Sequence, residues 1–511
     1  MARLTTFSKF LITLLIVGVL FFAVRWFLNN TETGQKVKDN ANVPAQNDEA
    51  GSGDISVGVV TWGGYAGGQY FNEGFKANTN SRFYKDYGFK VDFKILDDFE
   101  ASRAAFKNDD VQLLWATVDA FPTEVSALKE YDPVVVFQAD WSRGGDAIVA
   151  RRGINKVADL KGKKIAVAEL TPSHSFLIWL LEAGGLSTRD VQIVKQANAI
   201  DAAEVFKSQQ VDAAVVWSPD DEACLKAVPG SRVLESSKSA SNIIADIFIA
   251  KRSWVENNQE RVRQLYEGWM KGAAEINSND GNKRKAAKIL AEAFTGFSEE
   301  DTYKAISNVR LTTHGDNRNF FGLDSKYKGV TGNSLYTRMS QVYADLGYID
   351  GAVPNWRLIA YPKIVENTNL SGSANEAEGQ KTFTEISDTE GKSKSAVATK
   401  QVSIRFRTGE SQLDENAKYI IDKEFVEIAK AFANSRIRIE GNTDNVGSKA
   451  SNVALSKKRA EAVRDYLVKE HNMPFNRFIV IGNGPDKPVA SNDTEDGKSQ
   501  NRRTDFELVG E

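Results

Sequence analysis

Cysteine and histidine are scarce in this chain of 511 residues. It contains one cysteine, Cys224, and three histidines, His174, His314 and His471, which lie far apart in the sequence. A single cysteine excludes a disulfide framework and any thiolate cluster for zinc or iron–sulfur. Scattered histidines argue against a histidine-based metal site. The sequence therefore predicts neither a metal centre nor a cofactor.

The chain also lacks a surplus of basic charge. Its formal net charge is -3, with 41% hydrophobic and 26% charged residues, an ordinary globular composition. Nucleic acid is excluded as the main partner, because phosphate binding needs a clustered basic surplus. No Gly-rich phosphate loop or nucleophile motif is present in the central part of the chain, so we predict that the protein is not an enzyme. The length predicts two or three domains.

The N-terminus carries one long apolar run. Residues Phe10–Val24 are apolar, and the run resumes as Trp26–Leu28, so a helix over 10–28 would span roughly 28 Å, about one hydrocarbon core. Arg3 and Lys9 precede the run and place the N-terminus in the cytoplasm. We predict a single-pass inner-membrane anchor with the bulk of the chain in the periplasm of a Gram-negative cell envelope. The alternative is a cleaved signal peptide, but no small-x-small cleavage site follows the run.

Two polar stretches divide the rest of the chain. Residues 29–54 and 366–399 are rich in Asn, Asp, Glu, Gly and Ser and lack apolar periodicity, which predicts solvated linkers. The domains are then an anchor with its cytoplasmic tip over 1–28, a large domain over 55–365 and a small domain over 400–511.

The large domain alternates short apolar runs with helical patterns, which predicts an α/β fold with buried parallel strands. The predicted strands are Ile55–Val60, Gln112–Thr117, Lys164–Ala168, Val191–Val194 and Val211–Trp217. The predicted helices are Ser175–Ala183, Ala202–Ser208, Arg252–Asn277, Lys283–Ala293, Ser298–Val309 and Ser334–Leu346.

Loops at the strand ends carry small and hydrogen-bonding residues, where open α/β sheets usually bind ligands. Thr61–Gly68 (TWGGYAGG) combines glycines with flat aromatic walls, and Thr171–His174 opens a helix whose free N–H groups favour an anion or a carbonyl. Trp217–Asp220 repeats that design after another strand.

Four segments of the large domain, in order, are WGGYAGG, SRGGDAIVARRGI (142–154), DLKGKKIAVAELTPSHSFL (159–177) and QQVDAAVVWSPD (209–220). Together they resemble the periplasmic binding proteins of the nitrate, sulfonate and thiamine-precursor group. The resemblance implies a two-lobed receptor that closes on a solute, with the chain crossing between lobes near Gly144–Ala150 and Ser241–Ala250.

The same resemblance implies a set of cleft residues. They are Trp62, Gly64, Tyr65, Thr117, Asp119, Ser142, Asp146, Thr171, Ser173, His174, Trp217 and Asp246. Each has a structural alternative: the glycines as turn devices, Thr171 and Ser173 as helix caps, His174 as a satisfied loop residue and Trp217 as core. Helix N-termini place an oxyanion (phosphate, sulfonate or nitrate) or a small organic acid first. The aspartates favour an amine instead, or structural salt bridges.

The small domain reads β-α-β-α-β, with helices on one face of a sheet. The predicted elements are Val402–Phe406, Glu415–Ala433, Arg436–Gly441, Ser456–His471, Arg477–Gly482 and a closing strand near Phe506–Val509. On the second helix Arg459 falls four residues from both Leu455 and Val463, beside the apolar stripe. A charge there needs a partner, and Asp444 is the natural candidate, unless both face a ligand.

This pattern resembles the OmpA-like domain. The residues that carry the resemblance are Phe406, Gly441–Ser448, Asn452, Leu455–Ala460, Gly482, Gly484, Pro488–Ala490 and Asn501–Arg503. The family usually has histidine where this chain has Asn442. The resemblance implies that Asp444 and Arg459 hold the diaminopimelate of the peptidoglycan stem peptide, supported by Asn452, Thr443 and Arg503. The alternative is that Asp444 and Arg459 form only an internal salt bridge.

These features together predict a receptor for a small solute, tethered to the inner membrane and to the cell wall. It would serve transport, with an ABC permease, or sensing, with another membrane partner. The alternatives are a wall-anchoring strut whose receptor fold binds nothing, and a stator-like subunit. The stator reading is disfavoured, because no acidic residue lies in 10–28.

Overall fold

The computed structural model describes residues 54–510 except 350, 405, 407 and 408. The predicted anchor (1–28) and all but the last residue of the first predicted linker (29–54) lie outside the described residues. Within the described part of the chain, no helix is both long enough and apolar enough to cross a membrane.

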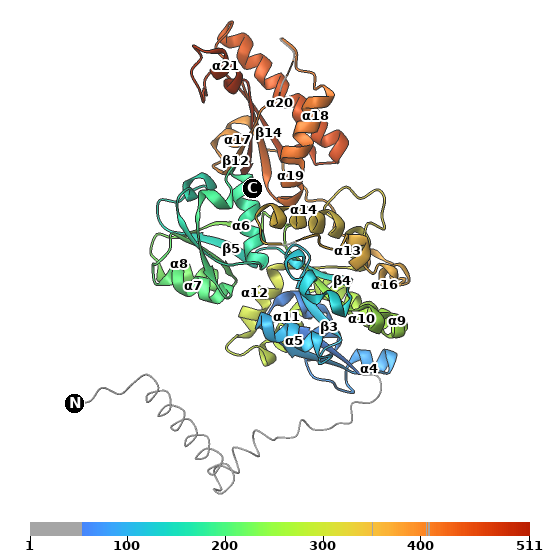
Figure 1. The fold of residues 1–511 in the computed structure, drawn as a ribbon. Coiled ribbons are helices and arrows are strands. Elements are labelled where there is room, and N and C mark those ends of the chain that lie inside the picture. The colour runs from blue at the N-terminus through green and yellow to red at the C-terminus, as the bar shows by residue number, and fades with distance from the viewer. Residues whose placement is uncertain (1–53, 350, 405, 407–408, 511) are drawn as a thin grey trace, which may run out of the picture. The chain divides into compact units, whose positions relative to one another are not determined.

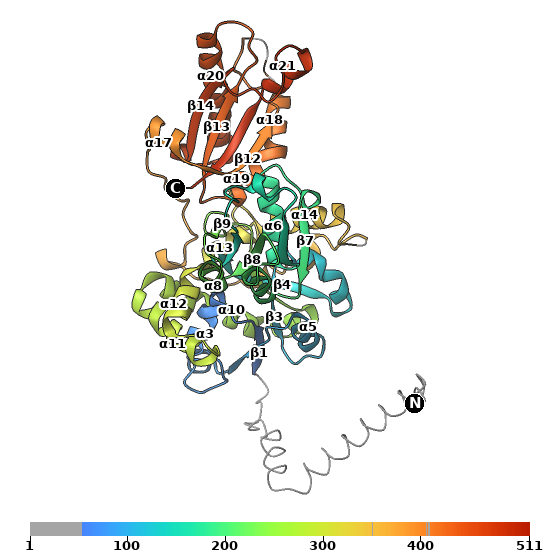
Figure 2. The ribbon, with the colours of Figure 1, turned by 90° about the vertical axis from the view of Figure 1, so that its left-hand side faces the viewer.

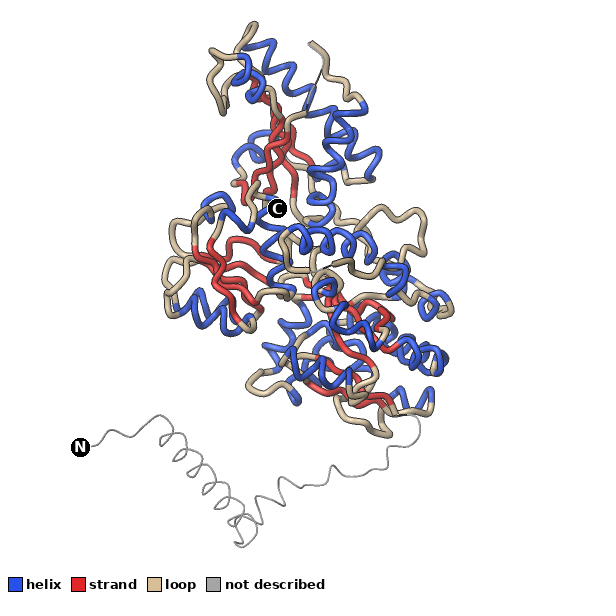
Figure 3. Tube along the Cα trace, viewed as in Figure 1, coloured by secondary structure: helices blue, strands red, loops and turns tan. Residues whose placement is uncertain are grey.

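The large domain contains two sheets, which form separate groups of strands (Figure 3). The first has six strands in the order β11-β4-β10-β3-β1-β2. Their bounds are β1 Ile55–Val59, β2 Val91–Ile95, β3 Leu113–Thr117, β4 Pro133–Ser142, β10 Ala245–Lys251 and β11 Val309–Leu311. Strand β1 is parallel to β2 and β3, whereas β10 runs antiparallel to β3 and β4. The expectation of parallel strands alone is therefore wrong for this sheet.

The second sheet has five strands in the order β7-β6-β8-β5-β9. Their bounds are β5 Asp146–Ala150, β6 Lys164–Ala168, β7 Gln192–Gln196, β8 Ala213–Trp217 and β9 Arg232–Ser236. Strand β6 is parallel to β7 and β8, and β5 is antiparallel to β8 and β9. Each sheet with its helices forms one lobe.

The chain crosses between the lobes twice, at residues 143–145 and 237–244, where β4 passes into β5 and β9 into β10. Both crossings overlap the predicted segments but end earlier, because Asp146–Ala150 and Ala245–Lys251 are buried strands of the two sheets. Strands β5 and β10, which follow the two crossings, are also the strands that pair antiparallel within the two sheets.

Helices surround these sheets, as Figure 1 shows. Their bounds are α3 Ala66–Phe71, α4 Arg82–Tyr87, α5 Phe99–Lys107, α6 Pro172–Ala183, α7 Ala199–Lys207, α8 Asp220–Ala227, α9 Arg252–Asn257, α10 Gln259–Ser278, α11 Asp280–Ala293, α12 Glu299–Ser307, α13 His314–Phe320, α14 Gly332–Asp345, α15 Trp356–Ile359 and α16 Lys363–Glu366. The single helix expected over 252–277 is two helices, separated at Asn258.

The second predicted linker is partly regular structure. Helix α17 (Asp388–Ser393) and the first residues of β12 (Ala396–Val402) lie within 366–399, and Phe383 is buried. The prediction of a wholly solvated segment is wrong, because these elements pack against the small domain's sheet and its buried arginines. Arg438 Nη1, for example, donates to the carbonyls of Gly391 and Lys394 at 3.0 and 2.6 Å.

The small domain has one sheet in the order β12-β15-β13-β14 (Figure 2). Its elements are α18 Glu415–Ile421, α19 Glu427–Ala431, β13 Arg436–Asn442, α20 Lys449–His471, β14 Phe478–Gly484, α21 Glu495–Asn501 and β15 Thr504–Val509. A π-helical turn joins α18 to α19. The strand predicted over 402–406 is wrong: β12 ends at Val402, where that strand was expected to begin.

Candidate functional site

Two aspartates lie opposite each other on neighbouring inner strands of the first sheet, each near the end of its strand. Asp246 on β10 is in register with Asp140 on β4 and with Thr117 on β3. Residues directly opposite in an antiparallel pair project from the same face of the sheet. The register therefore brings Asp140, Asp246 and Thr117 to one face, in the strands next to both crossings.

The aromatic glycine-rich loop closes over this face. The Trp62 indole N–H donates to Asp140 Oδ2 at 2.7 Å, and the Tyr65 hydroxyl donates to Asp246 Oδ2 at 2.9 Å. Gly64 is required between them, because a Cβ at this position would lie 1.4 Å from Asp140 Oδ2. The loop predicted from its glycines and aromatics thus contacts the two opposed carboxylates directly.

A third aspartate comes from the other lobe. Asp146 begins β5, opposite Trp217 at the end of β8, and its Oδ2 accepts a hydrogen bond from Ser142 at 2.7 Å. The Trp62 and Trp217 rings have centroids 6.4 Å apart at 57°. Trp62 lies over Gly145, where a Cβ would come within 2.1 Å of its ring. Residues from both lobes therefore meet at the first crossing.

Asp119, which follows β3, completes the cluster. Its side chain is fully buried, and neither carboxylate oxygen has a hydrogen-bond partner among the described residues. The same is true of Asp140 Oδ1 and of Thr117 Oγ1. Buried polar atoms are nearly always hydrogen-bonded in folded proteins, so these oxygens mark a place where the fold leaves polar groups to be satisfied.

Burial dominates the electrostatics of this cluster. It raises the pKa of Asp119, Asp140 and Asp146 to about 7 each. It also raises the pKa of Asp246 well above its ordinary value, and the charges of the other three aspartates add to the rise. The four acidic side chains are therefore close enough to interact electrostatically.

The nearest cations are engaged elsewhere. Arg143 pairs with Glu378 at 2.8 Å, and Arg103 pairs with Glu124 at 2.6 Å. Among the described residues, no ion pair to any of the four clustered aspartates is formed, so the expectation of structural salt bridges at these positions is not met.

Ser175 in α6 lies close to Asp119, and its hydroxyl offsets part of the burial effect on the Asp119 pKa. Thr171 does not cap α6 with its side chain; its hydroxyl donates to the Ala168 carbonyl at 2.8 Å. Ser173 Oγ is buried without a hydrogen-bond partner among the described residues. Its hydroxyl is therefore a further polar group near the cluster.

His174 lies in the first turn of α6. Its Nδ1 accepts from the Leu170 amide at 3.3 Å, and burial lowers the pKa of the imidazole to about 4. The imidazole is therefore neutral at physiological pH and adds no positive charge to the cleft.

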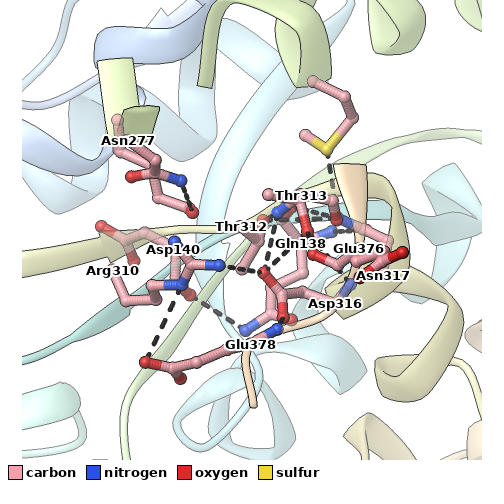
Figure 4. Close-up of polar contacts among 12 residues, drawn as sticks. Gln138, Asp140, Asn277, Arg310, Thr312, Thr313, Asp316, Asn317, Glu376 and Glu378 are labelled. Atoms are coloured by element: carbon pink, nitrogen blue, oxygen red, sulfur yellow. Dashed lines mark hydrogen bonds and ion pairs between the residues drawn. The ribbon is translucent and has the colours of Figure 1, made fainter. Parts of the chain in front are cut away.

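Asp140 is positioned by a buried polar network (Figure 4). Asn317 on α13 accepts from the Gln138 backbone amide at 2.8 Å and donates to the Gln138 carbonyl at 3.0 Å. The Gln138 side chain in turn donates to the Asp140 carbonyl at 3.0 Å. An asparagine side chain thus substitutes for a neighbouring strand and holds the backbone that carries Asp140.

The segment after the large domain is fastened to this network (Figure 4). The Glu378 amide donates to Asp316 Oδ1 at 2.6 Å, and Thr313 donates to the Glu376 carbonyl at 2.7 Å. Arg310 pairs with Asp316 at 3.1 Å. Residues 376–378 therefore belong to the large domain's surface and not to a free linker.

Most of the predicted cleft residues are brought together, and one member was missed. The structure gathers Trp62, Gly64, Tyr65, Thr117, Asp119, Ser142, Asp146, Trp217 and Asp246 around the crossings. Asp140 was not predicted. Its sequence signal was a charged residue in the mostly apolar run Pro133–Trp141, which was not among the predicted strands.

In the small domain, Asp444 lies in the loop after β13, which is held by hydrogen bonds of its own residues. Asp444 Oδ1 accepts from the Val446 amide at 3.0 Å, Thr443 donates to the Asp444 carbonyl at 2.8 Å, and Asn452 donates to the Val446 carbonyl at 3.0 Å. Thr443 and Asp444 therefore lie in one loop before α20, and Asn452 from the first turn of that helix holds it.

Arginines surround this loop. Arg502 Nη1 contacts Asp444 Oδ2 at 2.6 Å. Arg459 lies with its guanidinium 4.8 Å from the centroid of the Phe406 ring and donates to the Glu410 carbonyl at 3.0 Å. Burial lowers the pKa of Arg459 and the charge of Asp444 opposes this effect, so the two groups are within electrostatic reach.

Arg503 has a different place from the one predicted. Arg503 is buried directly before β15 and pairs at 2.9 Å with Asp505 on that strand. Its neighbour Arg502 is the residue that contacts Asp444. The sequence could not show whether Arg502 or Arg503 contacts Asp444. That depends on which of the two adjacent side chains faces the Asp444 loop in the folded domain.

Residues 75–280 match the NMT1/THI5-like family and residues 405–502 match the OmpA family. The chain therefore combines an NMT1/THI5-like solute-binding domain with a C-terminal OmpA-family domain.

Individual relatives fit this assignment. Outer membrane porin F of Pseudomonas aeruginosa is 37% identical over 111 residues, which cover 22% of this chain and 31% of the porin. A Brucella abortus protein named "Putative binding protein BAB2_1146" is 33% identical over 122 residues, covering 24% of this chain and 38% of that protein. The chain thus spans well under half the length of either relative.

Among solved structures, the periplasmic aliphatic sulphonate binding protein SsuA from Escherichia coli is similar to 62% of this chain and 99% of its own. The sequence identity is 18% and the TM-score 0.49.

Proposed function

We propose that this protein is a periplasmic solute receptor held at the cell wall by its OmpA-family domain. The proposal rests on one observation: the two family matches occupy separate parts of the chain, 75–280 and 405–502. The large domain binds a small molecule at the cluster between its lobes, and the small domain binds peptidoglycan at the Asp444 loop.

The wall-binding chemistry follows from the groups around Asp444. Diaminopimelate of the stem peptide carries an ammonium and a carboxylate on one carbon, which pair with an acid and with a guanidinium. Asp444 supplies the acid, and Arg459 supplies a half-buried guanidinium stacked on Phe406. Arg502 holds the Asp444 carboxylate in place.

The N-terminal segment gives the receptor its second attachment. An uncleaved helix over 10–28 anchors the chain in the inner membrane, with both domains in the periplasm. A receptor fixed in this way delivers its solute to an ABC permease or reports it to another membrane partner. The role is binding and not catalysis. The oxyanion ligand expected from the loop before α6 remains a prediction, and the four carboxylates weigh against it.

The test of wall binding is co-sedimentation of the full chain, in detergent, with purified sacculi. We expect Asp444→Ala combined with Arg459→Ala to abolish pelleting, because both partners of the zwitterion are lost. Lys458→Ala is the matched control, since Lys458 is an exposed cation on the same helix, and it should pellet like the unaltered chain. Undiminished pelleting of the double variant would show that this site does not bind the wall.

A further inference from the structure

The clustered carboxylates identify the chemistry of the solute. Asp119, Asp140 and Asp246 are buried at one place, and among the described residues none forms an ion pair. Buried charges in proteins are normally paired or neutralised. Asp140 and Asp246 each accept one hydrogen bond, from Trp62 and Tyr65, but no cation among the described residues offsets the three acids. A bound cation would supply that charge.

A second observation points to a ligand independently of the acids. Thr117 Oγ1 is buried, with 3% of the residue exposed, and has no hydrogen-bond partner in the described part of the chain. Its register with Asp246 places it on the same sheet face as the carboxylates. A hydroxyl oxygen beside carboxylate oxygens is a set of acceptors, and it suits a group that presents several N–H donors.

The walls of the site match an organic cation. Trp62 and Trp217 approach from different lobes with ring centroids 6.4 Å apart, and aromatic faces attract ammonium and guanidinium groups. Across the described residues, no three acidic, histidine or cysteine side chains converge closely enough to hold a metal ion.

An anion has little to bind here. His174, the one histidine beside the cleft, is neutral at physiological pH, and the nearest arginines, Arg103 and Arg143, are paired with glutamates. An oxyanion in this place would meet four acidic side chains and no unpaired cation from the described residues.

We infer that the solute carries a positively charged nitrogen group, an ammonium or amidinium, which binds between Asp119, Asp140 and Asp246. Asp146 adds a fourth carboxylate from the opposite lobe, so the same charge draws the two lobes together. This inference rests on the proposed receptor function and specifies its ligand class.

The experiment measures binding to the full chain at pH 8 by isothermal titration calorimetry and thermal shift. The cationic probes are putrescine, agmatine and choline, and the anionic probes are nitrate, sulfate and butanesulfonate at matched ionic strength. We expect at least one cation, and none of the anions, to bind and to raise Tm. Asp119→Asn and Asp246→Asn should each weaken that binding by about 10- to 100-fold, the loss typical of a removed charge-assisted contact. Asp86→Asn, at an exposed position of the same lobe, should leave binding unchanged.

The possible outcomes distinguish failure of the cationic-ligand inference from failure of the proposed receptor function. Binding of an anion without a cation would overturn the inference and leave the receptor function standing. Cation binding that persists in both Asp119→Asn and Asp246→Asn would overturn the assigned site. Absence of binding by either set of probes would overturn the receptor function and the inference with it. The comparison of cations with anions uses the unaltered chain, so it holds even if a variant misfolds.

Discussion

Replacing Asp119 with asparagine should stabilise the large domain at alkaline pH and not at acidic pH. Burial raises the pKa of Asp119 from 3.8 to about 7. Between about pH 4 and 7 the folded chain therefore holds a proton that the unfolded chain has released, so the stability from this group is lost progressively across that range and is gone above about pH 7. A shift of about three pKa units corresponds to about 4 kcal/mol above pH 7, an upper bound.

The surroundings of Asp119 set the net effect. Ser175 on α6 favours the carboxylate weakly, whereas the charge of Asp146 on β5 opposes it, and Tyr343 on α14 and Asp246 on β10 also lie within electrostatic reach. Asn removes the charge but leaves a buried amide, which costs about 1–3 kcal/mol when unpaired. The net gain for Asp119→Asn at pH 8.5 is then about 1–3 kcal/mol, or roughly 2–6 °C in Tm, and near zero at pH 5.

Tryptophan fluorescence is a suitable assay for this change. Eight of the nine tryptophans lie within 55–365 and none within 400–511, so the thermal transition of the large domain can be followed in the full chain. The variant and the unaltered chain are compared at pH 5 and at pH 8.5. A difference in Tm that is the same at both pH values, or a variant less stable at pH 8.5, would refute the reasoning.

Three further outcomes are expected. Asn317→Ala should lower the stability of the large domain by about 2–4 kcal/mol in chemical denaturation, because it leaves the buried Gln138 amide without an acceptor; an unchanged midpoint would contradict the role of this network. Cys224 should resist a thiol reagent at pH 8 in the native chain and react after denaturation, since it is buried and burial raises the pKa of its thiol to about 12; rapid native labelling would count against that environment. The full chain should stay in the membrane pellet after an alkaline carbonate wash, and a mature N-terminus beyond residue 28 would instead indicate a cleaved signal peptide.

Local patterns in the sequence determined a large part of this protein. The strands at Ile55–Val59 and Lys164–Ala168 were predicted to within a residue, because each is a short apolar run between polar turns. The Asp444 loop and the aromatic glycine loop were recognised because their residues are contiguous. In these cases all the residues that define the strand or loop lie within a few positions of one another in the sequence.

Tertiary structure alone decided how distant segments combine. Asp140 and Asp246 become neighbours through strand register, although 106 positions separate them, and register depends on how two sheets share the crossing strands. The choice of Arg502 over Arg503 beside Asp444 depends on how the chain turns between α21 and β15. The attachment of residues 376–378 likewise depends on acceptors from α13. Such contacts follow from packing across the fold, which no local pattern encodes, and they produce the carboxylate cluster that defines the cleft.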